Sequence, residues 1–163
     1  MGTQQGGART MHAINTEGKA PSNQGRGSRM RRFLVTWGPA VAYMVAVFFV
    51  SGDPEPPQPP GWAVFDKQEH MAAYFGLGLL LFWAFRGYWG FSRPLAGVLA
   101  VLAGAAYGLF DEMHQLFVPQ RSSDVGDALA DLVGVVAAQL AIALVVGLRA
   151  SRRARRAGGP GGG

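Results

Sequence analysis

The sequence contains no cysteine and few charged residues, and both absences restrict the kind of protein it encodes. Without cysteine, the chain forms no disulfide and holds no metal ion through thiolates. Charged residues make up 15% of the 163 residues and hydrophobic residues make up 49%, whereas soluble domains typically carry about 25% charged residues. The charges are also grouped into blocks with long uncharged runs between them. This distribution is typical of an integral membrane protein.

Four segments are apolar enough to cross a membrane, which requires about 20 helical residues. They lie at about residues 33–50, 66–85, 94–110 and 126–148. The uncharged run from Met71 to Phe85 is too short alone, so its helix is predicted to start near Asp66. The first segment follows a long basic stretch and precedes no A-x-A site, which favours a retained helix over a cleaved signal peptide. We therefore predict an all-α fold, a membrane bundle of four transmembrane helices in one domain, residues 33–149.

The remaining segments are predicted to be tails and connectors. Residues 1–32 are basic and polar and predict a disordered tail. Residues 51–61 contain five prolines, which favour a stiff extended connector. Residues 86–93 are interpreted as a short loop with two arginines, and residues 150–163 as an Arg/Gly-rich tail.

The basic residues predict the orientation of the chain. Thirteen of the fifteen Lys and Arg lie in the two tails, in the 86–93 loop or at Arg149 beside the second tail, which leaves Lys67 and Arg121 on the other side. By the positive-inside rule, both termini are then cytoplasmic in a multi-pass protein of the plasma membrane. Topology and attraction to anionic lipid explain the arginines of the C-terminal tail, so no nucleic-acid partner is expected.

Counting helical residues from the arginines predicts that three ionisable residues share one depth. A helix rises about 1.5 Å per residue, so His70, Asp111 and Asp131 all fall near the outer interface. Residues three or four apart share a helix face. Three polar stripes follow from this spacing: Asp66–His70–Tyr74, Asp111–Gln115 and Asp124–Asp127–Asp131.

Two interpretations of this polar layer remain open. In the first, the acids pair with Lys67, Arg121 or a protonated His70 and form a structural cap that joins the last three helices. In the second, the layer is a functional site, because ionisable groups at a membrane boundary are functional candidates. The candidate catalytic residues are His70, Asp66 and Asp111. The candidate binding residues are Lys67, Tyr74, Glu112, Gln115, Arg121, Asp127 and Asp131.

Small residues recur on two of the predicted helices. Gly104 and Gly108 form a GxxxG pattern, and Ala130, Gly134 and Ala138 form a second small face. Such faces allow close helix packing in lipid. They predict packing within one chain, with a homo-oligomer as the alternative.

No metal or cofactor is expected from the spacing of potential ligands. Acids and His70 offer oxygen and imidazole groups, but no compact motif such as H-E-x-x-H occurs. His114 is interpreted as a loop residue.

The two polar motifs resemble those of the VanZ-like family of small bacterial membrane proteins. The segments "DKQEHMAAYFGLGLLL" and "DEMHQLFVPQRSSDVGDALADLVG" carry the resemblance. It covers residues 33–148 and matches Asp66, Lys67, His70, Tyr74, Asp111, Glu112, Gln115, Pro119, Arg121, Asp127 and Gly134. Asp131 stands where the family pattern has Asn. The resemblance implies a cell-envelope role linked to resistance to the glycopeptide antibiotic teicoplanin.

Three functions are compatible with these observations. In the first, the polar layer binds a membrane lipid headgroup or a lipid-linked envelope precursor without turnover. In the second, the protein is an enzyme acting on a phosphorylated lipid, with Lys67 and Arg121 on the phosphate and His70 as acid–base group or nucleophile. In the third, it is a small transporter that uses buried acids as proton relays, although four spans are few and no inverted repeat is visible.

Overall fold

The computed structural model describes residues 2, 23–52, 63–119 and 124–157, with the side chains of residues 23–25 and 63–66 outside the described set. Within these ranges the chain is helical. The elements are α1 (Asn23–Ser51), α2 (Ala63–Ala84), a π-helical turn η1 (Phe85–Trp89), α3 (Arg93–Gln115) and α4 (Val125–Ala157). All four α-helices are long and apolar enough to cross a membrane. The predicted all-α bundle of four membrane-spanning helices is therefore confirmed.

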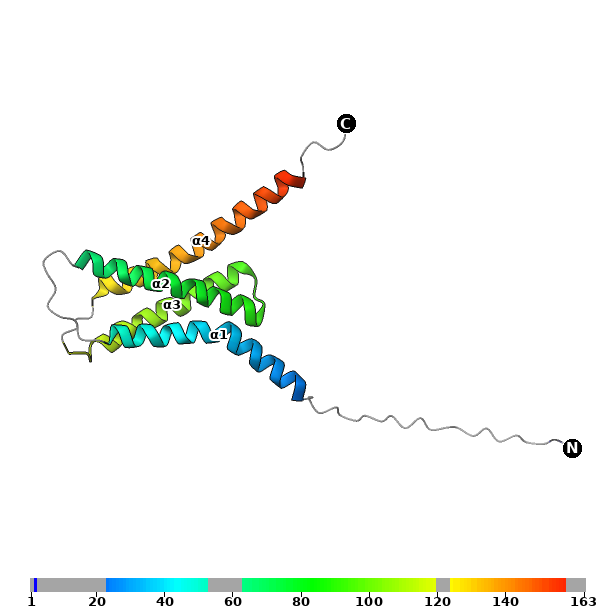
Figure 1. The fold of residues 1–163 in the computed structure, drawn as a ribbon, viewed down its shortest axis with the longest axis horizontal. Coiled ribbons are helices and arrows are strands. Elements are labelled where there is room, and N and C mark those ends of the chain that lie inside the picture. The colour runs from blue at the N-terminus through cyan, green and yellow to red at the C-terminus, as the bar shows by residue number, and fades with distance from the viewer. Residues whose placement is uncertain (1, 3–22, 53–62, 120–123, 158–163) are drawn as a thin grey trace.

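The helices run up and down in an antiparallel bundle (Figure 1). Helix α2 is central, because it packs against α1, α3 and α4. The start of α1 and the end of α4 lie at one end of the bundle, which we call the arginine end. The opposite end, where α2 begins, α3 ends and α4 begins, is the polar end.

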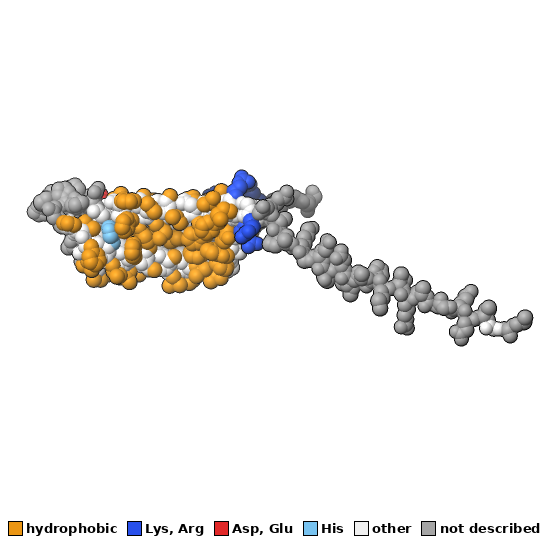
Figure 2. Space-filling view, turned by 90° about the horizontal axis from the view of Figure 1, so that it is seen from below, with side chains coloured by type: hydrophobic (Ala, Val, Ile, Leu, Met, Phe, Trp, Pro, Cys, Tyr) orange, Lys and Arg blue, Asp and Glu red, His pale blue; other side chains and the backbone are white. Residues whose placement is uncertain are grey.

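The surface between these two ends is apolar. Hydrophobic side chains cover the body of the molecule, and Lys and Arg side chains gather at one end of that body (Figure 2). Large side chains such as Phe49, Leu102 and Leu140 are 60–69% exposed. In water such exposure would be costly, so this surface fits a lipid environment.

Two helices extend beyond the predicted spans. Helix α1 starts at Asn23, so the prediction of disorder for residues 23–32 is wrong. Helix α4 continues to Ala157, through most of the predicted Arg-rich tail. Hydropathy detects only the part of a helix that lies in hydrocarbon, whereas Arg and Ala continue a helix readily in water. The other predicted tail segments and the proline-rich connector lie largely outside the described residues.

Proline and glycine shape the arginine end. Pro39 lies inside α1, where it removes one hydrogen bond and its ring clashes with the preceding turn. Figure 1 shows α1 bending part-way along its length. Between α2 and α3, Gly90 adopts a left-handed conformation with φ of 71°, and its amide donates to the Arg86 carbonyl. The predicted 86–93 loop is thus partly helical.

The core is built from small and aromatic residues. Leu77 and Leu81 of α2 pack with Ala100 of α3 and Val135 of α4, and all four are almost fully buried. A Cβ atom at Gly104 would come within 2.6 Å of Val135. A Cβ atom at Gly134 would overlap the α2 backbone at Met71. The two small faces predicted from sequence are therefore occupied by packing inside one chain.

Candidate functional site

Helix α2 places His70 and Tyr74 on one face of its first turns. The His70 side chain is 11% exposed, and its Nδ1 lies 3.0 Å from Oδ1 of Asp131 on α4. Tyr74, one helical turn further along, is 1% exposed. The i, i+4 spacing of the sequence therefore aims both side chains into the bundle.

The last turns of α3 bring three polar side chains inward. Asp111, Glu112 and Gln115 are all buried, at 1–4% exposure. Helix α3 continues to Gln115 instead of ending near residue 110, which puts Asp111 and Gln115 on one face, one turn apart. The Ser51 hydroxyl of α1 donates to Oδ1 of Asp111 at 2.5 Å. The Asp124 amide donates to Oε2 of Glu112 at 3.0 Å.

The start of α4 carries the acidic stripe, and each of its acids has a distinct partner. The Lys67 ammonium donates to Asp124 at 2.7 Å and to Asp127 at 2.8 Å. Asp131, one turn deeper, pairs instead with His70. The ion pairs therefore connect α2 to α4 in two successive layers.

Asp124 also begins helix α4 as a capping residue. Its Oδ1 accepts a hydrogen bond from the Gly126 amide at 2.8 Å, and carboxylates are favoured at helix N-termini. The hydrogen bond from Lys67, followed by that from the Gly126 amide, lowers the pKa of Asp124 below its ordinary value.

These contacts form a structural cap of the kind described by the first of the two interpretations of the polar layer. Lys67, Glu112 and the stripe from Asp124 to Asp131 join α2, α3 and α4 at the polar end. The cap leaves Lys67 engaged by two carboxylates, 39% exposed on its side chain. This arrangement differs from a lysine presented to a ligand phosphate.

A pocket of about 310 Å³ opens beside this cap. Its walls come from α1 and α2, including Ala46, Val47 and Ala73. The polar groups that line it are Tyr43, Ser51, Glu69, His70, Tyr74 and Asp111. The pocket thus combines an apolar wall with a polar floor that is rich in hydrogen-bond acceptors. Ligand pockets commonly show this combination.

A second cavity of about 680 Å³ lies along α3 and α4 near the arginine end. Its lining is almost entirely apolar, with Arg93 and Gln139 as polar members. It contains none of the predicted site residues.

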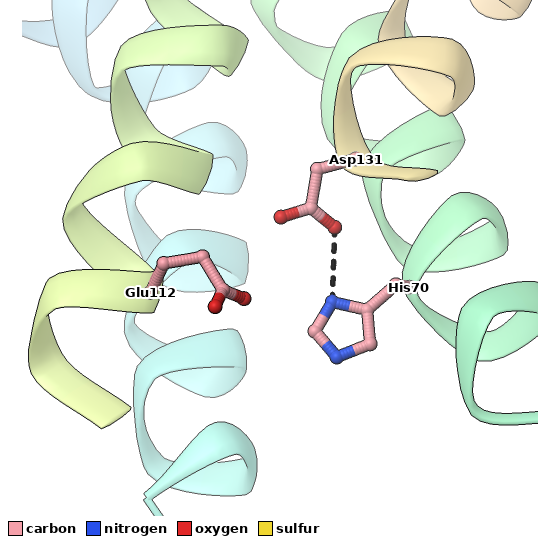
Figure 3. A group of neighbouring side chains, drawn as sticks. All are labelled: His70, Glu112 and Asp131. Atoms are coloured by element: carbon pink, nitrogen blue, oxygen red, sulfur yellow. Dashed lines mark hydrogen bonds and ion pairs between the residues drawn. The ribbon is translucent and has the colours of Figure 1, made fainter. Parts of the chain in front are cut away.

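Three of the buried polar groups converge on one point. His70, Glu112 and Asp131 each offer one nitrogen or oxygen atom, and these atoms lie within 4.8 Å of one another. Figure 3 shows the three side chains pointing toward one another, with the His70–Asp131 contact drawn. We call them the triad.

The structure brings most of the predicted site residues together. Eight lie in the cap, the pocket or directly beside them: Lys67, His70, Tyr74, Asp111, Glu112, Gln115, Asp127 and Asp131. The side chain of Asp66 and all of Arg121 lie outside the described residues.

Sequence reasoning missed or misplaced four residues of this region. Ser51 was assigned to the external connector, but it ends α1 and binds Asp111. Tyr43 and Glu69 line the pocket, and spacing from the arginines would have placed Glu69 beside His70. His114 is not a loop residue: it lies in α3, and its ring centroid is 4.0 Å from that of Phe48.

Comparison with known proteins identifies the family. No curated protein and no solved structure matches the chain. The model of the VanZ/LLP1 family matches residues 26–146, a range that includes α2, α3, most of α1 and α4, and the whole polar end. Both sequence motifs and the observed bundle lie within the matched range, and the chain belongs to the VanZ/LLP1 family.

Proposed function

We propose that this protein is a multi-pass plasma-membrane protein that binds the headgroup of an envelope lipid in the pocket at its polar end. The pocket itself carries the proposal. It is lined by α1, α2 and the end of α3, and it combines apolar side chains with hydroxyl, imidazole and carboxylate groups. An amphipathic lipid presents the same two kinds of surface.

The floor favours a headgroup that donates hydrogen bonds. Glu69 and Asp111 supply carboxylate oxygens at the pocket lining, and the described lining contains no Lys or Arg. Lys67 is bound by Asp124 and Asp127. Sugar hydroxyls or an ammonium group therefore suit the pocket better than a bare phosphate does.

Binding by different headgroups tests this preference. Protein in detergent would be offered a diglycosyl lipid, phosphatidylethanolamine and phosphatidic acid in competition, and the bound lipids counted by native mass spectrometry. We expect the hydroxyl-rich or amine-bearing lipids to displace phosphatidic acid. Preferential retention of phosphatidic acid would contradict the proposal.

A matched pair of variants locates the binding. Ala46→Phe places a large ring in the pocket and should abolish selective binding. Ala42→Phe lies one turn earlier on α1, at an exposed position outside the pocket lining, and should leave binding unchanged. Equal effects of the two variants on selective lipid binding would show that the pocket is not the binding site.

The family relationship supports an envelope role linked to teicoplanin-type resistance. In a strain lacking this protein, the wild-type chain should restore tolerance to teicoplanin, whereas Ala46→Phe should not. Membrane abundance of both proteins would be measured by immunoblot. Full tolerance to teicoplanin with Ala46→Phe at equal abundance would show that the envelope role does not depend on the pocket.

An enzyme acting on a phosphorylated lipid is the second candidate. One observation favours it: His70 lines the pocket while Asp131 fixes its ring, as a carboxylate orients a general base. Phosphate release from polyprenyl phosphate or phosphatidic acid, lost in His70→Gln, would establish this activity. If no phosphate is released even at high protein concentration, the result would count against the enzyme and favour the binding function.

A further inference from the structure

We propose that the triad of His70, Glu112 and Asp131 binds one divalent transition-metal cation. One potential ligand comes from each of α2, α3 and α4, and the three ligand atoms already lie within 4.8 Å of one another. Figure 3 shows all three groups facing a common space. The proposal is independent of lipid binding, although His70 belongs to both the triad and the pocket.

The donor set indicates the class of metal. One imidazole nitrogen with two carboxylate oxygens suits Zn²⁺ or Mn²⁺, whereas Mg²⁺ and Ca²⁺ favour sites made of oxygen alone. Three protein ligands also leave a coordination position for water or a headgroup oxygen, as in zinc sites with an open position.

The observed geometry is close to that of a bound site. Zinc ligands lie about 2.0–2.2 Å from the metal, which separates tetrahedral ligand atoms by roughly 3.4 Å. His70 Nδ1 and Asp131 Oδ1 are 3.0 Å apart in a hydrogen bond, and an ion bound to both atoms would replace the proton between them. Closing the rest of the triad needs a shift of roughly 1 Å, which a small rotation of the Glu112 side chain would supply.

The described part of the polar end is rich in acids, and several of them are buried. The described acids there are Glu69, Asp111, Glu112, Asp124, Asp127 and Asp131, and four of them are at most 5% exposed. In the described segments of this end, Lys67 is the sole Lys or Arg, and Asp124 and Asp127 bind it. A buried carboxylate is stabilised by a positive charge beside it, and a divalent cation at the triad would lie directly against the fully buried Asp131.

Asp131 provides an independent indication of a ligand. Its side chain is fully buried, and among the described residues its Oδ2 atom has no hydrogen-bond donor. Buried polar atoms are normally hydrogen-bonded. Gly108 lies against this oxygen, because a Cβ there would sit 3.0 Å from it. The carboxylate therefore projects between α3 and α4 toward Glu112, with an acceptor available for an ion.

Sequence spacing gave no sign of this site because its ligands come from three helices. Motifs such as H-E-x-x-H place two ligands on one helix face. Here His70, Glu112 and Asp131 meet only through helix packing. Ligand spacing within a single segment of the sequence therefore does not reveal this site.

Metal binding can be measured on the purified full-length chain without any lipid ligand. The protein, carrying no polyhistidine tag, would be stripped with chelator and dialysed against Zn²⁺ or Mn²⁺ alone. Bound metal would be counted by mass spectrometry, and Co²⁺ would report the ligand field by its absorption spectrum. We expect one ion per chain, and excess Mg²⁺ should not displace it.

Variants of the triad should weaken binding by more than the about 10- to 100-fold that follows loss of an outer-shell partner. Asp131→Asn is nearly isosteric, so it tests the ligand with little change of shape, and Glu112→Gln does the same on α3. Asp124→Asn and His114→Ala remove an acid and an imidazole outside the triad, and should bind Zn²⁺ like the wild type.

Measuring how Zn²⁺ changes the melting temperature keeps the test valid if a variant is less stable. Zn²⁺ should raise the melting temperature of the wild type and of Asp124→Asn, but not that of Asp131→Asn. Absence of stoichiometric binding to the wild type would overturn the proposal. So would equal binding by Asp131→Asn, because that result places the ion elsewhere. Metal binding without selective lipid binding would support the triad and count against the proposed function.

Discussion

Asp131 stands where the VanZ-like pattern has Asn, and its contacts show what a carboxylate does there. It is fully buried, and it pairs with His70 at 3.0 Å. Depth counting from the sequence predicted that these two residues share a layer. It did not predict which acid of the stripe pairs with His70, because neighbouring acids differ by one helical turn and only packing selects between them.

Two replacements of Asp131 should distinguish the contribution of its charge to stability from that of its hydrogen bond. Asp131→Ala deprives the largely buried His70 nitrogen of this contact, which should reduce the free energy of unfolding by about 1–3 kcal/mol. Asp131→Asn keeps an acceptor oxygen and should cost less. Unfolding in increasing SDS, followed by circular dichroism, measures both. An Asn variant less stable than the Ala variant would contradict this assignment.

The lowered pKa of Asp124 predicts a pH dependence with a definite sign. Because its pKa is lower in the folded state than its ordinary value of 3.8, the stabilisation is complete above that value. It is lost as the pH falls through the folded pKa. Melting temperatures of the wild type and Asp124→Asn should therefore differ at about pH 7, and the difference should shrink as the pH falls below the ordinary pKa of the carboxyl group. A difference that persists unchanged at the lower pH would show that Asp124 does not act through its charge.

At the scale of elements, the small residues were predictable from sequence, but their partners were not. Gly104 and Gly108 form a recognisable GxxxG face, yet the pattern alone fits packing within a chain or between chains. The structure places Val135 and Asp131 of α4 against these two glycines, and Gly134 against the α2 backbone. Helix ends were also less predictable, because the charged turns of α1 and α4 continue beyond the hydrocarbon.

Alanine at Gly134 tests the closest of these helix contacts. Its Cβ would overlap the backbone of Met71, which cannot rotate away, so we expect a loss of about 1–3 kcal/mol from overpacking. Gly147→Ala is a matched control on the same helix, because no atom lies within 4 Å of its Cβ. It should be neutral or stabilising by up to about 1 kcal/mol. SDS unfolding of both variants makes the comparison, and similar losses would refute this packing.

At the scale of the whole molecule, Lys and Arg side chains gather at the arginine end, and the buried acids lie at the polar end. Charge segregation along the sequence predicted the four spans. It also predicted that the two termini and the 86–93 loop lie on the same side of the membrane. It could not reveal the pocket, because Tyr43 and Ser51 come from α1, whose sequence has no polar motif of its own. The convergence of three helices at the triad likewise follows from packing and not from any local spacing.

The absence of cysteine makes the orientation of the whole chain directly testable. Two single-cysteine variants suffice: Ser151→Cys at an exposed position of α4 at the arginine end, and Gln68→Cys at an exposed position of α2 at the polar end. If the arginine end is cytoplasmic, a membrane-impermeant maleimide should label the Gln68→Cys variant in intact cells. It should label the Ser151→Cys variant only after lysis. The reverse pattern would invert the predicted topology.

The central claim is that the pocket at the polar end selects one class of lipid, and photocrosslinking in living cells tests it most directly. A photoreactive amino acid would replace Ala46, which lines the pocket, or Val45, its 49% exposed neighbour on α1 at nearly the same depth. Mass spectrometry would then identify the lipids attached at each position. Position 46 should capture one headgroup class, enriched several-fold over the bulk membrane composition captured at position 45. The same lipid mixture at both positions would contradict the account.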